Sequence, residues 1–138
     1  MDRRPDPRSD ARERALYLLY EADAKGISPI DALALQLIEP DELTAALVSG
    51  VAEHAAAIDT AIAARAKGWT LARMPVVDVN IIRLATFELM ERQHVPVAVV
   101  IDEAVELAKR FSTDDSGRFV NGVLAALATE LRREATSG

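Results

Sequence analysis

Residues 95–127 read VPVAVVIDEAVELAKRFSTDDSGRFVNGVLAAL, and this stretch decides the fold class. Val97, Val99 and Val100 look strand-like locally, but the segment DEAVELAKR that follows is strongly helical. Apolar residues recur there at helical spacing, as Ile101, Val105 and Ala108 show. We therefore expect a helix over residues 97–111, a connector at 112–115 and a last helix over 116–133.

The same spacing continues upstream of residue 95. Helices are expected over residues 10–25, from Ser28–Pro29 to Pro40, over 42–67 and over 76–91. Asp10 with Glu13 resembles a capping box, and Gly26 and Gly68 are placed to end helices. Alanine and leucine are plentiful and aromatics make up only 4%, a balance that favours helix over sheet. The sequence thus predicts an all-α bundle with short connections.

The chain divides into a short arm and one domain. Residues 1–9 contain Pro5, Pro7 and alternating charges, which are typical of a flexible, arginine-containing arm. Residues 10–134 are long enough for a single helical domain with its own core. The first 14 residues hold five arginines against four acidic residues, whereas the whole chain has a net charge of −6. Such a protein is not a generally basic nucleic-acid binder.

Several classes of protein are disfavoured by what the sequence lacks. It has no cysteine, so disulfides and thiolate metal sites are excluded. The charged N-terminus is unlike a secretory signal, and no apolar run approaches the roughly 20 residues needed to cross a bilayer. His54 and His94 lack metal-ligand spacing, and no phosphate-binding glycine loop or nucleophile motif is present. We expect a cytoplasmic protein that is not an enzyme, with no metal, no cofactor and no membrane.

Three stretches resemble the NusB family of transcription antitermination factors. Residues 95–127 carry the family's VP, EA, ELAK, DS and FVNGVL elements without gaps. MPVVDVNIIRLATFEL at 74–89 is similar to the family's hydrophobic helix, and DARERALYLLYEAD at 10–23 to its opening helix. The resemblance covers residues 8–127 and is weakest over 27–67. It implies an all-α, compact bundle of about seven helices in two packed helical sub-bundles.

The resemblance also implies a function. Proteins of this family bind the boxA element of ribosomal RNA leader transcripts together with NusE, a ribosomal protein, and the complex helps RNA polymerase in the elongation complex to resist termination. Two alternatives stay open: a helical protein-interaction module with little RNA binding, and an accessory factor in ribosomal RNA modification. A homodimer that shares an apolar helix face is also open.

Candidate RNA contacts follow from the resemblance and from chemistry. Arginines suit RNA because a guanidinium pairs with phosphates and stacks on unpaired bases. The candidates are Arg8, Arg12 and Arg14 near the arm, Tyr20 and Phe119 as stacking rings, and Lys109 and Arg118 near the connector. Tyr20 is interpreted as somewhat more suited to the core, and Phe119 equally to core or surface. Asp2, Asp6 and Asp10 offset part of the positive charge of the arm, so tight RNA binding is expected to need the partner protein.

Candidate contacts with a partner protein are Asp78, Arg83, Glu88 and Asp115. Asp78 could equally cap the helix after Pro75, and Arg83 and Glu88 could pair with neighbours within the chain. Asp114 and Asp115 precede the expected start of the last helix, where capping of free N–H groups is favoured over cation binding.

Asn121–Gly122 lies inside the last expected helix although both residues are poor helix formers. The expected reason is the close approach of another helix at Gly122. On that interpretation, leucine at this position should overpack the bundle and destabilise it.

Overall fold

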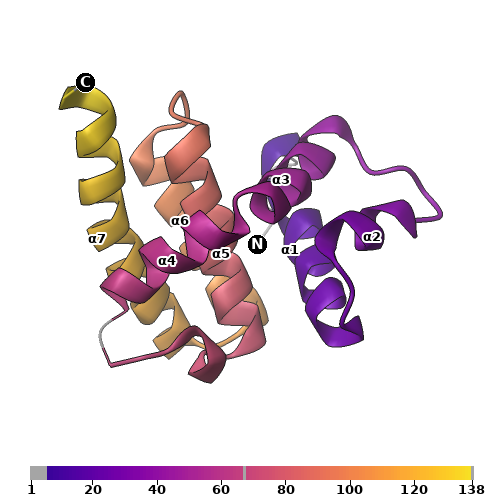
Figure 1. Cartoon of the computed structure of the whole chain (residues 1–138), viewed down its shortest axis with the longest axis horizontal. Helices are drawn as coiled ribbons and strands as arrows, with labels where there is room; N and C mark the ends of the chain where they lie inside the picture. The colour runs from indigo at the N-terminus through magenta and orange to yellow at the C-terminus, as the bar shows by residue number, and fades with distance from the viewer. Residues whose placement is uncertain (1–5, 67, 138) are drawn as a thin grey trace.

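The computed structural model describes residues 6–66 and 68–137, with side chains to residue 132. The described residues form seven α-helices and one 3₁₀ turn, with no strand among them (Figure 1). In chain order these are α1 (Pro7–Lys25), α2 (Pro29–Ala34), α3 (Glu42–Glu53), α4 (Ala55–Arg65), η1 (Leu71–Arg73), α5 (Val76–Glu91), α6 (Val97–Phe111) and α7 (Asp114–Ser137). The all-α prediction is confirmed.

Two groups of helices share one central helix. Helices α1, α2 and α3 pack together on one side, and α4, α6 and α7 gather on the other (Figure 1). Helix α5 contacts α1 and α3 as well as α4, α6 and α7. It is therefore buried around most of its circumference, from Asp78 to Leu89, as expected of a helix with apolar residues on several faces.

The helix ends predicted from capping residues agree only in part with the structure. Gly26 ends α1 in the left-handed conformation at φ 68°, and Ser28 caps α2 by accepting from the Asp31 N–H. The predicted start at Asp10 was wrong, because Asp6 caps α1 and accepts from the Arg8 N–H at 2.9 Å. That backbone hydrogen bond lowers the pKa of Asp6. Helix α1 thus begins within the expected arm, of which residues 1–5 lie outside the described residues.

The single helix predicted over residues 42–67 was wrong. The chain breaks at His54 into α3 and α4, whose axes differ by 74°. Helix α3 buries Leu47 and Val51 in the core, while α4 buries Ile58 and Ile62. The bend lets α3 cover α1 and α5 while α4 turns toward α5 and α7, and a straight helix cannot do both.

None of the described helices is by itself long and apolar enough to span a bilayer; α3 and α4 would meet that criterion only when taken together across their bend.

The start of α7 also differs from the prediction. Thr113 caps the helix: its hydroxyl accepts from the Ser116 N–H at 3.0 Å and its carbonyl from the Gly117 N–H at 3.1 Å. Asp114 and Asp115 lie inside the first turn instead of before it. They complement the positive end of the helix without capping it.

Arg132 on α7 holds the connection between α5 and α6. Its guanidinium donates to the carbonyls of Leu89 at 2.8 Å and Val95 at 3.0 Å, and at longer distances to those of Glu88, Arg92 and Gln93. Leu89 lies in the last turn of α5, whose carbonyls lack helical partners, and Arg92, Gln93 and Val95 follow the end of that helix. The loop at residues 92–96 is thereby fixed beside the start of α6.

The close approach predicted at Gly122 was wrong. Gly122 and Asn121 are exposed, and a β-carbon added at Gly122 would meet nothing within 4 Å. A side chain there is free to point into solvent, so the expected overpacking does not arise.

Gly122→Ala is instead expected to raise the free energy of unfolding by up to about 1 kcal/mol, since alanine restricts the unfolded chain and favours helix. Urea denaturation followed by circular dichroism measures the change. A loss of stability would show that Gly122 has a packing role after all.

Candidate nucleic-acid interface

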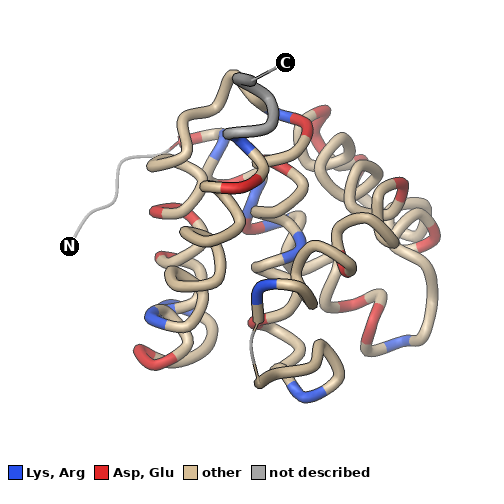
Figure 2. Tube along the Cα trace, turned by 60° about the vertical axis from the view of Figure 1, so that its left-hand side comes forward, with Lys and Arg blue, Asp and Glu red and all other residues tan. Residues whose placement is uncertain are grey.

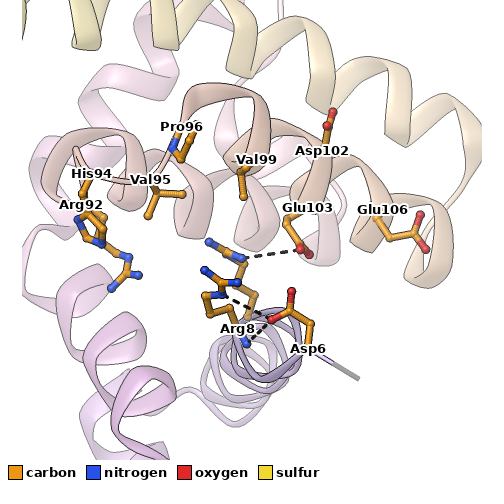
Figure 3. Close-up of a pocket in the computed structure, with 11 residues that line it drawn as sticks. Asp6, Arg8, Arg92, His94, Val95, Pro96, Val99, Asp102, Glu103 and Glu106 are labelled. Atoms are coloured by element: carbon orange, nitrogen blue, oxygen red, sulfur yellow. Dashed lines mark hydrogen bonds and ion pairs between the residues drawn. The ribbon is translucent and has the colours of Figure 1, made fainter. Parts of the chain in front are cut away.

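A cleft of about 880 Å³, the arm pocket, lies between the start of α1, the loop at residues 92–96 and α6 as far as Glu106 (Figure 3). Its charges are mixed. The basic residues Arg8, Arg12 and Arg92 face the acidic residues Asp6, Asp102, Glu103 and Glu106, with His94 at the same rim. Neither a pure anion site nor a pure cation site results.

Arg8 exposes its charge to solvent. Its side chain is 74% exposed and its Nε lies 3.6 Å from Asp6 Oδ1 (Figure 3). Arg14 is half-buried and donates to the Ile38 carbonyl at 3.0 Å. Of the three arm arginines predicted to contact RNA, Arg8 is therefore the most available to a phosphate.

Arg12 is buried, with 3% of its surface exposed, and is paired with Glu88, which is 2% exposed. Its Nε and Nη2 donate to the two carboxylate oxygens at 2.8 and 2.9 Å. Burial works against the charge on Arg12, but the hydrogen bonds and attraction of Glu88 outweigh it and raise the Arg12 pKa. An RNA contact by Arg12 or a partner contact by Glu88 would require this pair to open, and both stay predictions.

A second set of candidates gathers where α6 ends and α7 begins. We call Lys109, Asp115, Arg118 and Phe119 the α7 cluster. Arg118 and Asp115 are exposed and form an ion pair with each other, one turn apart. The stem of Lys109 packs beside Gly117, where an added β-carbon would lie 3.2 Å from Lys109 Cγ. Phe119 is half-buried against the core.

Asp78 anchors the start of α7, which carries most of the α7 cluster. It is buried and accepts from the Ser116 hydroxyl at 2.7 Å, joining the first turn of α5 to that of α7. The interpretation of Asp78 as a cap was wrong, because Pro75 occupies the cap position of α5 with no side-chain hydrogen bond. Its Oδ1 is buried with no hydrogen-bond partner among the described residues.

The remaining candidates lie elsewhere. Tyr20 is 45% exposed, so its interpretation as a core residue was wrong. Arg83 donates to both carboxylate oxygens of Asp59, at 2.9 and 3.1 Å, and more weakly to Asp23. It pairs with neighbours on α4 and α1, the alternative that the sequence left open.

The two sites follow one another along α6. The lining of the arm pocket runs from Pro96 to Glu106, and the α7 cluster begins at Lys109, one turn further on. Basic and acidic residues are interspersed along the trace (Figure 2). Glu13 and Arg110 pair at 2.6 Å between α1 and α6. The surface between the sites is therefore not continuously basic.

Sequence reasoning did not single out three residues that lie beside the candidates. Arg92 and His94 line the arm pocket, and the exposed Trp69 touches Phe119. The only sequence signal for Trp69 was its position as the sole tryptophan, next to Gly68 in an expected connector. Among the described residues, no group of three or more His, Asp or Glu is arranged to hold a metal ion.

These features define an all-helical protein with two polar surfaces along α6. The model of the NusB family matches residues 9–129. The chain belongs to the NusB family.

Relatives and solved structures agree with this assignment. The chain is 50% identical over 127 residues to the transcription antitermination protein NusB of Saccharopolyspora erythraea, covering 88% of this chain and 86% of the relative. It is 48% identical to that of Streptomyces avermitilis, covering 92% and 96%. The structure is similar to T. maritima NusB, with a TM-score of 0.83, 32% identity and coverage of 96% and 99%. It is also similar to a chain in a structure of NusB and NusE in complex with dsRNA, with a TM-score of 0.76, 27% identity and coverage of 88% and 96%.

Proposed function

We propose that this chain is a cytoplasmic antitermination factor that binds boxA RNA of ribosomal RNA leader transcripts jointly with NusE. It promotes processive transcription by the elongating RNA polymerase through assembly, without a chemical step. The observation that carries the proposal is the similarity of the whole domain to a NusB seen with NusE and dsRNA. Membership of the family supports the same role.

The contacts assigned to RNA are those whose charge or ring reaches the surface. Arg8 lies in the arm pocket, Tyr20 is exposed on α1, and Lys109, Arg118 and Phe119 lie in the α7 cluster. Contacts with NusE are assigned to Asp115, which is exposed, and to Arg83, whose side chain is 23% exposed. Asp78 supports these contacts from the core by holding Ser116.

The mixed charge of the arm pocket implies that RNA affinity of the isolated chain is weak. Each carboxylate near Arg8 offsets part of its attraction for phosphate, and the chain carries a net charge of −6. NusE is therefore expected to supply part of the RNA-binding surface.

Gel shifts with boxA RNA and a scrambled RNA, each with and without NusE, test the proposal. We expect preference for boxA that appears only when NusE is present. Binding of NusE with no gain for either RNA would instead support a protein-interaction module. Equal affinity for boxA with and without NusE would contradict the need for the partner.

Replacing Arg8 with alanine tests whether the arm pocket contacts phosphate. We expect weaker binding of all RNAs and a reduction of about one in the slope of log affinity against log salt concentration, since one phosphate contact is lost. Arg65→Ala is the matched control, because Arg65 is a partly exposed arginine on α4 that pairs with Glu130. A slope that Arg8→Ala leaves unaltered would assign Arg8 to a structural role.

A further inference from the structure

Trp69 and Phe119 form an aromatic pair at the surface. Their ring centroids lie 5.9 Å apart with planes inclined by 59°. Phe119 is half-buried, whereas Trp69 is 51% exposed. Trp69 is also the only tryptophan of the chain. About half of this indole therefore faces solvent while its other side rests on Phe119.

Backbone geometry holds both rings in place. Gly68 adopts φ 79°, a conformation that favours glycine, and the Trp69 N–H donates to the Ala66 carbonyl at 3.0 Å. Phe119 lies in the second turn of α7, whose start is fixed by the Thr113 cap and by the hydrogen bond from Ser116 to Asp78. A ring pair that is already ordered loses little freedom when a ligand stacks on it.

Burial alone does not account for Trp69. An indole that only covered the core would place most of its area against apolar side chains, since burial of that area is what stabilises it. Here about half of the area stays in water, an arrangement typical of tryptophan at binding surfaces.

The charged residues around the pair suit an anionic ligand. Arg73 lies in η1, four residues after Trp69. Lys109 packs beside Gly117, and Gly117 is two residues before Phe119 in the chain. Both are exposed, and neither forms an ion pair with any residue whose side chain the structure describes. Arg118 adds a third cation, although Asp115 offsets it. Aromatic rings beside unpaired cations are the features that bind single-stranded nucleic acid.

We propose that Trp69, backed by Phe119, is a stacking platform for an unpaired base of the bound RNA. Lys109, at the end of α6, and Arg73, in η1, are the cations we assign to the adjoining phosphates. Arg8 lies at the start of α1 and the platform lies beside the start of α7, so one RNA strand contacts the protein at two places. This inference rests on the proposed function and adds to it the selection of unpaired over paired RNA, because a base within a duplex has no free face to stack.

The test uses the full chain with NusE and fluorescently labelled boxA RNA, either single-stranded or annealed to its complement. Trp69→Leu is expected to weaken binding of the single strand by roughly 5-fold or more, the range for loss of one stacked base. The salt slope should not change, because no charge is lost. Trp69→Phe should restore most of the affinity, and duplex binding should change little.

Tyr17→Leu is the matched control, since Tyr17 is a similarly exposed aromatic on α1 that contacts Phe111 and not Phe119. Thermal unfolding establishes that each variant folds. A second readout needs no variant: emission from Trp69 in the wild-type chain should be quenched by the single strand and not by the duplex, measured at high RNA concentration without NusE.

Three outcomes would overturn the inference. They are unchanged affinity of Trp69→Leu, equal weakening of single-stranded and duplex RNA, and loss of NusE association instead of RNA binding. Suppose that the wild-type protein prefers boxA and that Arg8→Ala reduces the salt slope, but that Trp69→Leu does not change RNA affinity. The stacking platform is then wrong and the proposed function stands. If the wild-type chain with NusE shows no preference for boxA, both fail.

Discussion

Glu88→Ala is expected to lower the free energy of unfolding by about 3–5 kcal/mol, because it leaves the buried guanidinium of Arg12 without its main partner. Glu103 does not replace Glu88, since its carboxylate lies 3.8 Å from Arg12 Nη1 and also accepts from the Ser9 hydroxyl. Arg92 loses its contact with Glu88 as well. Urea denaturation followed by circular dichroism measures the loss.

Two further variants separate the ion pair from other causes. Glu91→Ala removes a partly exposed carboxylate that pairs with His54, and it should cost less than about 1 kcal/mol. The double variant Arg12→Met with Glu88→Leu should recover most of the stability, because it removes both buried charges and keeps the volume. A loss below about 1 kcal/mol in Glu88→Ala would show that water or Glu103 satisfies Arg12.

The ion pair between Arg12 and Glu88 also affects the arm pocket. Arg12 lies one turn after Arg8, and its contacts with Glu88 and Glu103 join α1 to α5 and α6. If α1 loosens, Arg8 and Asp6 lose their fixed position at the arm pocket. We therefore expect Glu88→Ala to weaken RNA binding indirectly, in proportion to the loss of structure in α1.

Gly50→Ala is expected to destabilise the protein by about 1–3 kcal/mol through overpacking. A β-carbon added at Gly50 would overlap the ring of Phe87, which is buried on α5 and has little space to move. The gain in helix propensity, up to about 1 kcal/mol, is too small to compensate. The sign is opposite to that expected for Gly122→Ala, although both glycines lie inside helices.

Phe87→Leu provides the second arm of this experiment. Shortening the ring should reduce the cost of Gly50→Ala, so the two changes should be non-additive by at least about 0.5 kcal/mol. Strict additivity, or a stable Gly50→Ala variant, would show that α3 and α5 separate easily at this point.

The sequence by itself determined the family, the all-α class and the course of α5 and α6. Apolar spacing in α5 and α6 depends only on which residues lie on one helix face, and Gly26 and Ser28 act through local backbone geometry, so both were predictable. The sequence also identified Arg8, Lys109, Arg118 and Phe119 as candidates, because their residue types suit RNA whatever their surroundings.

Only the tertiary structure decided which side chains are exposed to a ligand and where the chain bends. Arg8 and Arg12 look alike in sequence, yet one is exposed and the other pairs with Glu88, 76 residues away. Gly50 and Gly122 differ because Phe87 packs against one of them alone, and the break at His54 follows from the separate surfaces that α3 and α4 cover. Trp69 became a candidate for base stacking only because the fold places Phe119 against it. In each instance the deciding contact joins residues far apart in the chain, which local spacing does not encode.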